Sequence, residues 1–203
     1  MIAILDYNMG NVKSIANMFK KIGKEAKVTS DINEIRNAEK LILPGVGYFD
    51  YAMDQLRSMD YFSILDQMVL VDKKPILGIC LGAQLMLKGS EEGKPTPGLS
   101  WIDGQVVKFQ LNLQGLRVPH MGWNDVRIIK DDKLVQDLPE EPRFYFVHSY
   151  YFNLVHKEDE LLSTHYGQDF ASAFSHENIF GVQFHPEKSH KYGMQLLKNF
   201  AEL

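Results

Sequence analysis

Residues 76–87 have the sequence ILGICLGAQLML, and this stretch indicates both the fold class and a reactive centre. An apolar run ends at Cys80, which lies between Gly78 and Gly82, and a helical pattern follows. In a nucleophile elbow, small neighbouring residues allow a sharp strand-to-helix turn that exposes the side chain at its tip. The Gly-x-Cys-x-Gly spacing therefore predicts an exposed cysteine between a buried strand and a helix over residues 81–93.

The chemistry of Cys80 has two interpretations from this stretch alone. The first turn of a helix offers free N–H groups and partial positive charge, which favour a thiolate and a developing oxyanion. A buried cysteine that packs as a small apolar side chain is the alternative. Because Cys80 is the only cysteine, the chain has no intramolecular disulfide and no cysteine-rich metal site, and a reducing cytoplasm is the expected setting.

Apolar periodicity on both sides of this stretch predicts an α/β fold. In the first half, short apolar runs alternate with helical patterns, which indicates a mostly parallel sheet covered by helices, with strands expected at 2–7, 25–30, 40–45 and 74–80. After Leu99 the pattern changes to strand-like pieces in antiparallel or mixed pairing, at 99–109, 116–129, 143–152, 161–166, 170–176 and 179–185. A final helix has its apolar face at Met194, Leu197, Phe200 and Ala201. Without a repeat or linker, residues 1–203 are expected to form one domain.

Composition narrows the class of function. The 203 residues are 45% hydrophobic and 24% charged, which is ordinary for a soluble globular protein. A formal net charge of −4 argues against a broad nucleic-acid interface, because phosphate binding requires clustered Lys and Arg. The start MIAILDY has no basic leader, and no run of 18 apolar residues occurs, so neither a signal peptide nor a membrane span is expected. A small substrate or a protein partner fits better.

A base for Cys80 is found in the segment GVQFHPEKS, residues 181–189. His185 ends an apolar strand, and Glu187 follows it after Pro186. Residues i and i+2 of an extended segment point to the same side, so the imidazole and the carboxylate are expected to meet. A glutamate that accepts from one ring nitrogen leaves the other nitrogen free to take a proton from a thiol. The sequence therefore predicts a triad of Cys80, His185 and Glu187, against the alternative of a solvated strand-end histidine.

These segments carry a family resemblance. GICLGAQL (residues 78–85) and FHPEKS (184–189) resemble the class I, or triad, glutamine amidotransferases. Four further segments are similar to the glutaminase subunits of imidazole glycerol phosphate synthases: 4–23, LILPGVGYFDYAM (41–53), VPHMGWN (118–124) and YFVHSYYF (145–152). The resemblance covers essentially the whole chain. It implies a flavodoxin-like, three-layer fold with added antiparallel strands in the C-terminal half.

The resemblance also implies a set of site residues. From the residues alone, LPGVG (43–47) is a glycine-rich turn able to offer N–H groups to an anion, and Gln84 lies one helical turn beyond Cys80. In the family, this loop and the residue after the cysteine form the oxyanion hole, here Gly45 and Val46 after a peptide flip, with Leu81. The glutamine substrate would be held by Gln84, Glu92, His148, Ser149 and Tyr150.

The implied reaction is hydrolysis of glutamine to glutamate and ammonia through a Cys80 thioester, without a metal or an organic cofactor. Because 203 residues leave no room for a synthetase domain, the ammonia must pass to another protein, which the resemblance identifies as a (β/α)₈-barrel cyclase in a heterodimer. The expected docking edge and ammonia passage comprise Met121, Trp123, Asn124 and Lys188, since exposed tryptophan is enriched at interface hot spots. The alternative for Trp123 is a place in the hydrophobic core.

Three alternatives to this function stay open at the level of sequence. The histidine-pathway subunits make imidazole glycerol phosphate and AICAR, but DYNMGN (6–11) and Ser100 depart from their usual pattern. Such departures are expected in paralogues that supply ammonia for amidino groups on bacterial surface sugars. A redox sensor built on a low-pKa Cys80 has no use for an oriented base. A small-molecule hydrolase with a similar elbow is disfavoured by Gln84, Glu92 and the HSYY segment.

Overall fold

The computed structural model describes residues 1–110 and 116–203, and its centre is a parallel sheet. The spatial order is β2-β1-β3-β4-β12, and each neighbouring pair is parallel. Val182 of β12 pairs with Ile79 of β4, so the segments that follow these two strands leave the sheet side by side. The strands are β1 (Ile2–Leu5), β2 (Ala26–Thr29), β3 (Lys40–Leu43), β4 (Ile76–Ile79) and β12 (Ile179–Val182).

Antiparallel strands extend this sheet, as the second half of the sequence predicts. The extension consists of β5 (Gly104–Lys108), β7 (Arg127–Ile128), β9 (Tyr150–Leu154), β10 (Glu160–His165) and β11 (Asp169–His176). A separate pair is formed by β6 (His120–Asp125) and β8 (Arg143–His148). The strand-like run 143–152 is therefore two strands that separate at Ser149, because β8 pairs with β6 whereas β9 pairs with β5 and β11.

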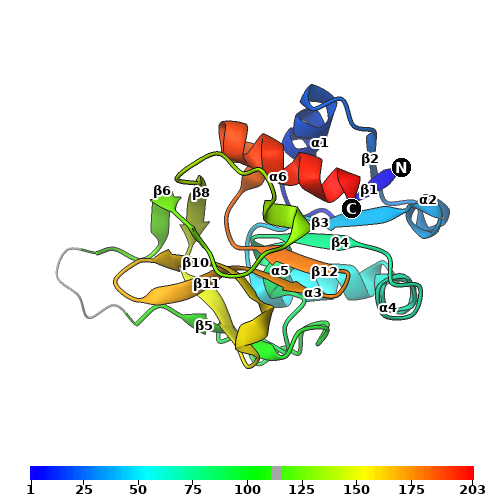
Figure 1. Cartoon of the computed structure of the whole chain (residues 1–203). Helices are drawn as coiled ribbons and strands as arrows, with labels where there is room; N and C mark the ends of the chain where they lie inside the picture. The colour runs from blue at the N-terminus through cyan, green and yellow to red at the C-terminus, as the bar shows by residue number, and fades with distance from the viewer. Residues whose placement is uncertain (111–115) are drawn as a thin grey trace.

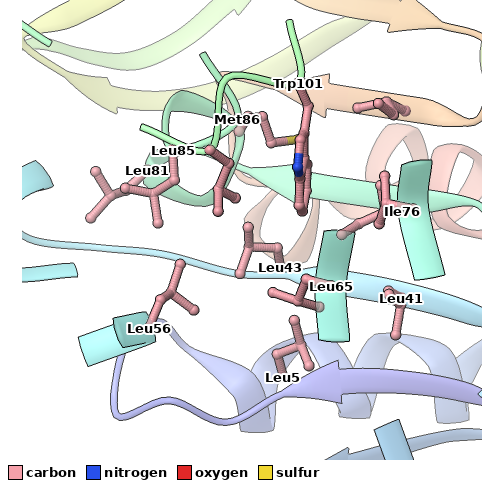
Figure 2. Packing of buried hydrophobic residues seen from close by; sticks show 14 of the residues in the cluster. Leu5, Leu41, Leu43, Leu56, Leu65, Ile76, Leu81, Leu85, Met86 and Trp101 are labelled. Atoms are coloured by element: carbon pink, nitrogen blue, oxygen red, sulfur yellow. The ribbon is translucent and has the colours of Figure 1, made fainter. Parts of the chain in front are cut away.

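Helices cover both faces of the parallel sheet, which makes three layers (Figure 1). Side chains alternate along β1: Ile4 packs in a cluster with the first and last helices, whereas Leu5 packs with helices on the opposite face (Figure 2). The first face carries α1 (Val12–Lys21) and α6 (His190–Glu202), and the second carries α2 (Ile32–Asn37), α3 (Phe49–Ser58) and α4 (Tyr61–Asp66). Short helical turns lie at Gln67–Val71, Lys133–Val135, Lys157–Asp159 and Pro186–Lys188.

The expected helix over residues 81–93 is wrong in length, because α5 spans only Leu81–Gln84. The carbonyl of Leu85 accepts the N–H of Leu99 (2.7 Å), and the carbonyl of Met86 accepts the N–H of Trp101 (2.9 Å). These acceptors are thereby occupied by a distant segment instead of by the next helical turn. A tertiary contact ends the helix where the apolar pattern alone would continue it.

Among residues 1–110 and 116–203, no helix has both the length and the apolar character needed to cross a bilayer. That the whole chain forms one domain stays a prediction.

Candidate active site

The turn at Cys80 has the geometry of a nucleophile elbow. Its φ of 53° and ψ of −111° lie in a region that side-chain-bearing residues rarely adopt, and its N–H donates to the Val182 carbonyl at 2.8 Å. The flanking glycines make room for this turn. A Cβ on Gly78 would lie 2.5 Å from the Cα of Ala83, and one on Gly82 would lie 1.9 Å from the Leu43 carbonyl oxygen. The two glycines therefore allow α5 to sit directly on β3 and β4.

Gly82→Ala is expected to destabilise the fold, because the new methyl group would overlap a backbone oxygen that no side-chain rotation can remove. We expect the free energy of unfolding to fall by about 2–3 kcal/mol in urea titrations, with an unchanged slope. Gly89→Ala is the control, since its Cβ would meet the flexible Gln105 Oε1 at 3.2 Å and the Thr96 carbonyl oxygen no closer than 3.3 Å. Equal stability of the two variants would contradict this account of the elbow.

The structure brings the three members of the predicted triad together. His185 Nδ1 lies 2.8 Å from Glu187 Oε1, and both side chains are 2% exposed. Because a carboxylate accepts, the ring hydrogen lies on Nδ1. Among the described residues, His185 Nε2 and Glu187 Oε2 have no hydrogen-bond partner. Burial lowers the pKa of His185, but the negative charge of Cys80, together with the hydrogen bond and charge of Glu187, outweighs burial and raises this pKa to about 10.

The local structure that joins His185 to Glu187 differs from the expected extended segment. His185 is extended, but Pro186 begins a 3₁₀ turn that contains Glu187 and Lys188. Proline is favoured at the first position of a helical turn, since its fixed φ suits the turn and its missing N–H is not needed there. The contact between His185 and Glu187 is as predicted, but the expected extended geometry is wrong. The 3₁₀ turn, and not the alternation of side chains along a strand, brings the carboxylate back to the imidazole.

A cavity of about 340 Å³ opens beside the triad. Cys80 and His185 lie in its wall, and the other lining residues include all five that the family resemblance assigns to the substrate. Those lining residues are Val46, Gly47, Leu81, Gln84, Glu92, Pro119, Val147, His148, Ser149, Tyr150 and Lys188. Gly45 lies behind this wall, where a Cβ would be 2.6 Å from the Gly82 nitrogen.

The loop expected to form the oxyanion hole borders the cavity. Val46 is 46% exposed at this position. Leu81, which packs close to Gly45, is the first residue of α5, and the N–H of a first helical residue has no intrahelical acceptor. Sequence reasoning missed Tyr7, whose fully buried hydroxyl donates to the Pro44 carbonyl. Tyr7 thus holds the residue that precedes the Gly45–Val46 peptide.

The cavity wall contains the Glu92 carboxylate and the Gln84 amide, and this amide is linked to a second amide behind the wall, that of Gln183. Glu92 Oε2 accepts the N–H of Phe49 at 2.9 Å, and burial raises the pKa of Glu92. Gln84 Nε2 donates to the Tyr150 carbonyl (3.2 Å) and to Gln183 Oε1 (3.0 Å).

Gln183 is the second residue that the sequence analysis overlooked. It is fully buried, and its Nε2 donates to Cys80 Sγ at 3.7 Å. Its position two residues before His185, within the run 179–185 that the sequence predicts to be a strand, was the available signal. An amide donor beside the sulfur stabilises negative charge on it.

A pair of buried histidines supports this wall. His148 Nδ1 lies 2.7 Å from the Tyr150 carbonyl oxygen, and His148 Nε2 lies 3.0 Å from His120 Nδ1. Burial lowers the pKa of His120 to about 4 and that of His148 to about 3. Both rings are therefore uncharged at neutral pH.

The lowered histidine pKa values predict that the protein loses stability as the pH falls from about 6.5 toward 4. In this range the unfolded chain binds protons on His120 and His148, whereas the folded chain does not, so protonation favours unfolding. We expect His148→Phe, which cannot bind a proton, to show a shallower dependence of unfolding free energy on pH in urea titrations. Parallel curves for the variant and the wild type would contradict this.

The expected docking edge is exposed on β6. Met121 is 62% exposed and Trp123 is 39% exposed. Trp123 stacks on His190 with a centroid distance of 5.5 Å. The alternative that Trp123 fills the core is therefore wrong. Asn124 is different, since its side chain turns back and donates to the His165 carbonyl at 3.0 Å.

This edge borders the cavity that contains Cys80 and His185. Met121 pairs with Val147 on β8, and Val147 lines the cavity. Lys188 also lines the cavity, and its Nζ lies 5.5 Å from the centroid of the Tyr145 ring. Of the four residues predicted to face a partner, Lys188 lines the cavity, and Met121 is paired with a residue that lines it. In the part of the chain that the structure describes, no group of three or more His, Cys, Asp or Glu side chains is arranged to hold a metal ion.

Comparisons with known proteins agree with this geometry. The family model described as "Glutamine amidotransferase class-I" matches residues 3–203. The "Imidazole glycerol phosphate synthase subunit HisH 2" of Methanococcus maripaludis is 52% identical over 202 residues, which cover 100% of this chain and 99% of that protein. The protein of the same name from Pseudomonas aeruginosa is 48% identical over 203 residues, with both chains fully covered.

Two solved structures share the fold. A crystal structure titled as a glutamine amidotransferase has a TM-score of 0.74 at 18% identity and covers 99% of this chain and 97% of that one. The glutaminase domain of Trypanosoma brucei CTPS has a TM-score of 0.66 at 15% identity and covers 99% of this chain and 93% of that one. Together with the full-length relatives, these matches place the sequence: the chain belongs to the class-I glutamine amidotransferase family and, within it, to the HisH subunits of imidazole glycerol phosphate synthase.

Proposed function

We propose that this chain hydrolyses L-glutamine to glutamate and ammonia through a covalent thioester on Cys80. The observation that carries the proposal is the cavity in which Cys80 lies beside His185, whose Nδ1 donates to Glu187 at 2.8 Å. A nucleophile, a base and a residue that orients the base, all next to a space for a ligand, form the arrangement required for acyl transfer.

In the first half of the reaction, the Cys80 thiolate attacks the side-chain amide carbon and a C–S bond forms. The carbonyl oxygen becomes an oxyanion, which the N–H groups of Val46 and Leu81 stabilise once the Gly45–Val46 peptide has turned toward the cavity. The C–N bond then breaks as His185 gives its Nε2 proton to the leaving nitrogen, and ammonia departs. Gln84, Glu92 and the backbone of residues 148–150 hold the amino-acid end of the substrate.

In the second half, water attacks the thioester carbon and transfers a proton to His185 Nε2. The C–S bond breaks, glutamate leaves, and the thiolate and imidazolium are restored. Glu187 keeps the ring oriented in both halves, because its carboxylate accepts the Nδ1 hydrogen throughout. The proposed reaction needs no redox partner and no external cofactor.

We further propose that the ammonia passes to a separate (β/α)₈-barrel cyclase, which forms imidazole glycerol phosphate and AICAR in histidine biosynthesis. The name that the relatives carry, a synthase subunit, supports this acceptor over surface-sugar amidination. The docking edge, with Met121 and Trp123 exposed beside the cavity, supports a protein partner. A cytoplasmic location fits the free thiol of Cys80.

The isolated chain is expected to be a poor glutaminase, because Val46 lies at an exposed position where a docked partner would complete the oxyanion loop. Glutamate release should be slow for the chain alone and should rise by at least about tenfold when the cyclase and its acceptor substrate are added. High turnover by the chain alone would contradict the gating, and no turnover under any condition would favour the redox-sensor class.

A further inference from the structure

We propose that His120 and His148 are positioning residues for Cys80. Both rings act as uncharged Nδ1–H tautomers in one hydrogen-bond chain, which begins at Asn124 on the docking edge and ends at the sulfur. The kinetic meaning of this chain rests on the proposed function, since it assumes that Cys80 is the nucleophile. The measurements that test it do not require glutamine to be hydrolysed.

The outer end of the chain has a fixed direction. Asn124 Oδ1 accepts the N–H of Asp125 at 2.9 Å, and Asn124 Nδ2 donates to the His165 carbonyl at 3.0 Å. A backbone N–H can only donate and a carbonyl can only accept, so these two contacts determine the orientation of the amide. The same Nδ2 lies 3.2 Å from His120 Nε2. This ring nitrogen must therefore accept, and the hydrogen of the uncharged ring lies on Nδ1.

The inner end leads independently to the same direction. His148 Nδ1 faces the Tyr150 carbonyl at 2.7 Å, so this nitrogen carries the hydrogen. In the uncharged ring, His148 Nε2 then accepts. Its partner at 3.0 Å is His120 Nδ1, the nitrogen that the outer end identifies as a donor. Because both ends require the same tautomers, the pair is internally consistent without any assumption about the middle.

The chain continues from the Tyr150 carbonyl to the sulfur. This carbonyl also accepts from Gln84 Nε2 at 3.2 Å, which identifies the nitrogen end of that amide. Gln84 Nε2 donates in turn to Gln183 Oε1 at 3.0 Å. Gln183 must then present its Nε2 to Cys80 Sγ, at 3.7 Å. A donor directed at the sulfur is what a thiolate nucleophile needs.

Packing prevents the rings from escaping this arrangement. His120 lies between Phe146 and Tyr166, with centroid distances of 4.7 Å and 4.0 Å and interplanar angles of 25° in both cases. His120 is 3% exposed and His148 is 6% exposed, so water does not readily replace a lost partner. A buried polar group without a partner is costly, which couples the two tautomers to each other. A substitution at Asn124 is therefore expected to change the hydrogen bonding, and with it the reactivity, of the Cys80 sulfur.

The first test reads the tautomers directly. Nitrogen-15 NMR of the full chain, labelled on histidine and recorded at neutral pH, should show His120 and His148 with a protonated Nδ1 and an unprotonated Nε2. The two rings are assigned by the signals that disappear in His120→Phe and His148→Phe. A protonated Nε2 on either ring would overturn the proposal, and a purely space-filling role for the histidines does not predict one tautomer for both.

The second test measures coupling through the only cysteine of the chain. Alkylation by iodoacetamide at neutral pH reports on Cys80 alone. Asn124→Ala and His120→Phe should each slow alkylation about threefold or more, and the double variant should be no slower than the slower single variant. If His120→Phe does not fold, Asn124→Asp replaces it, because an aspartate cannot donate a hydrogen bond to His120 Nε2. Arg143→Gln, on β8 opposite Asp125, is the matched surface control.

The outcomes separate this inference from the proposed function. Two results would contradict the hydrogen-bond chain without affecting the proposed glutaminase reaction. One is a wild-type alkylation rate in Asn124→Ala, and the other is a pair of effects, from Asn124→Ala and His120→Phe, that multiply in the double variant. Conversely, a protein that shows the expected tautomers and coupling but never hydrolyses glutamine would support the hydrogen-bond chain and contradict the proposed function.

Discussion

Cys80→Ala is expected to abolish the release of ammonia from glutamine while the protein stays folded. The thioester requires the sulfur, and no other side chain in the cavity wall is a comparable nucleophile. The rate of glutamate formation in the presence of the cyclase should therefore fall by at least about 10⁴-fold. The measurement is glutamate release from glutamine, with the amount of soluble protein matched between variant and wild type.

Cys80→Ser is the shape-matched control for this experiment. It keeps a side-chain acceptor for Gln183 and adds no bulk at the strained turn. We expect it to be as inactive as the alanine variant, because a serine hydroxyl ionises far less readily than a thiol. Thermal unfolding of both variants should stay close to that of the wild type. Substantial glutamine hydrolysis by either variant would remove Cys80 from the reaction and with it the proposed mechanism.

The second large effect is expected at the base. His185→Asn should be as inactive as Cys80→Ala, since it removes the imidazole that lies beside Cys80 in the cavity wall and whose Nε2 has no other hydrogen-bond partner among the described residues. Glu187→Gln should retain a weak rate, because the new amide oxygen still accepts the Nδ1 hydrogen and keeps the tautomer. It removes, however, a negative charge that raises the pKa of His185. We expect the rate of glutamate release by Glu187→Gln to exceed that of His185→Asn by about tenfold or more.

Kinetics with glutamine as the variable substrate distinguish these roles from a loss of binding. Both variants should lower kcat while KM changes little, because neither residue contacts the amino-acid end of the substrate in the proposed complex. Equal rates in the two variants, or a loss confined to KM, would contradict the division of roles between His185 and Glu187.

Local sequence patterns predicted most of the architecture. Alternating and continuous apolar runs predicted four of the five strands of the parallel sheet, because burial on a sheet face is decided by side-chain direction along each strand. The fifth strand, β12, was expected in the antiparallel or mixed half, but it pairs in parallel with β4. The elbow followed from two glycines around Cys80, since only a residue without a Cβ fits against the Leu43 and Ala83 backbones. Helix length was less predictable: α5 ends at Gln84 because carbonyls beyond it are used by residues 99–101.

For the site, the sequence by itself determined which residues have the required chemistry: a lone cysteine at an elbow, and a histidine followed closely by a glutamate. Only the tertiary structure decided which other groups meet them. The pairing of β12 with β4 brings Gln183 to the Cys80 sulfur across 103 residues of chain, and the pairing of β6 with β8 places His148 opposite His120. Contacts of this kind depend on strand order and on the satisfaction of buried polar groups, and neither is encoded in the spacing of any single segment.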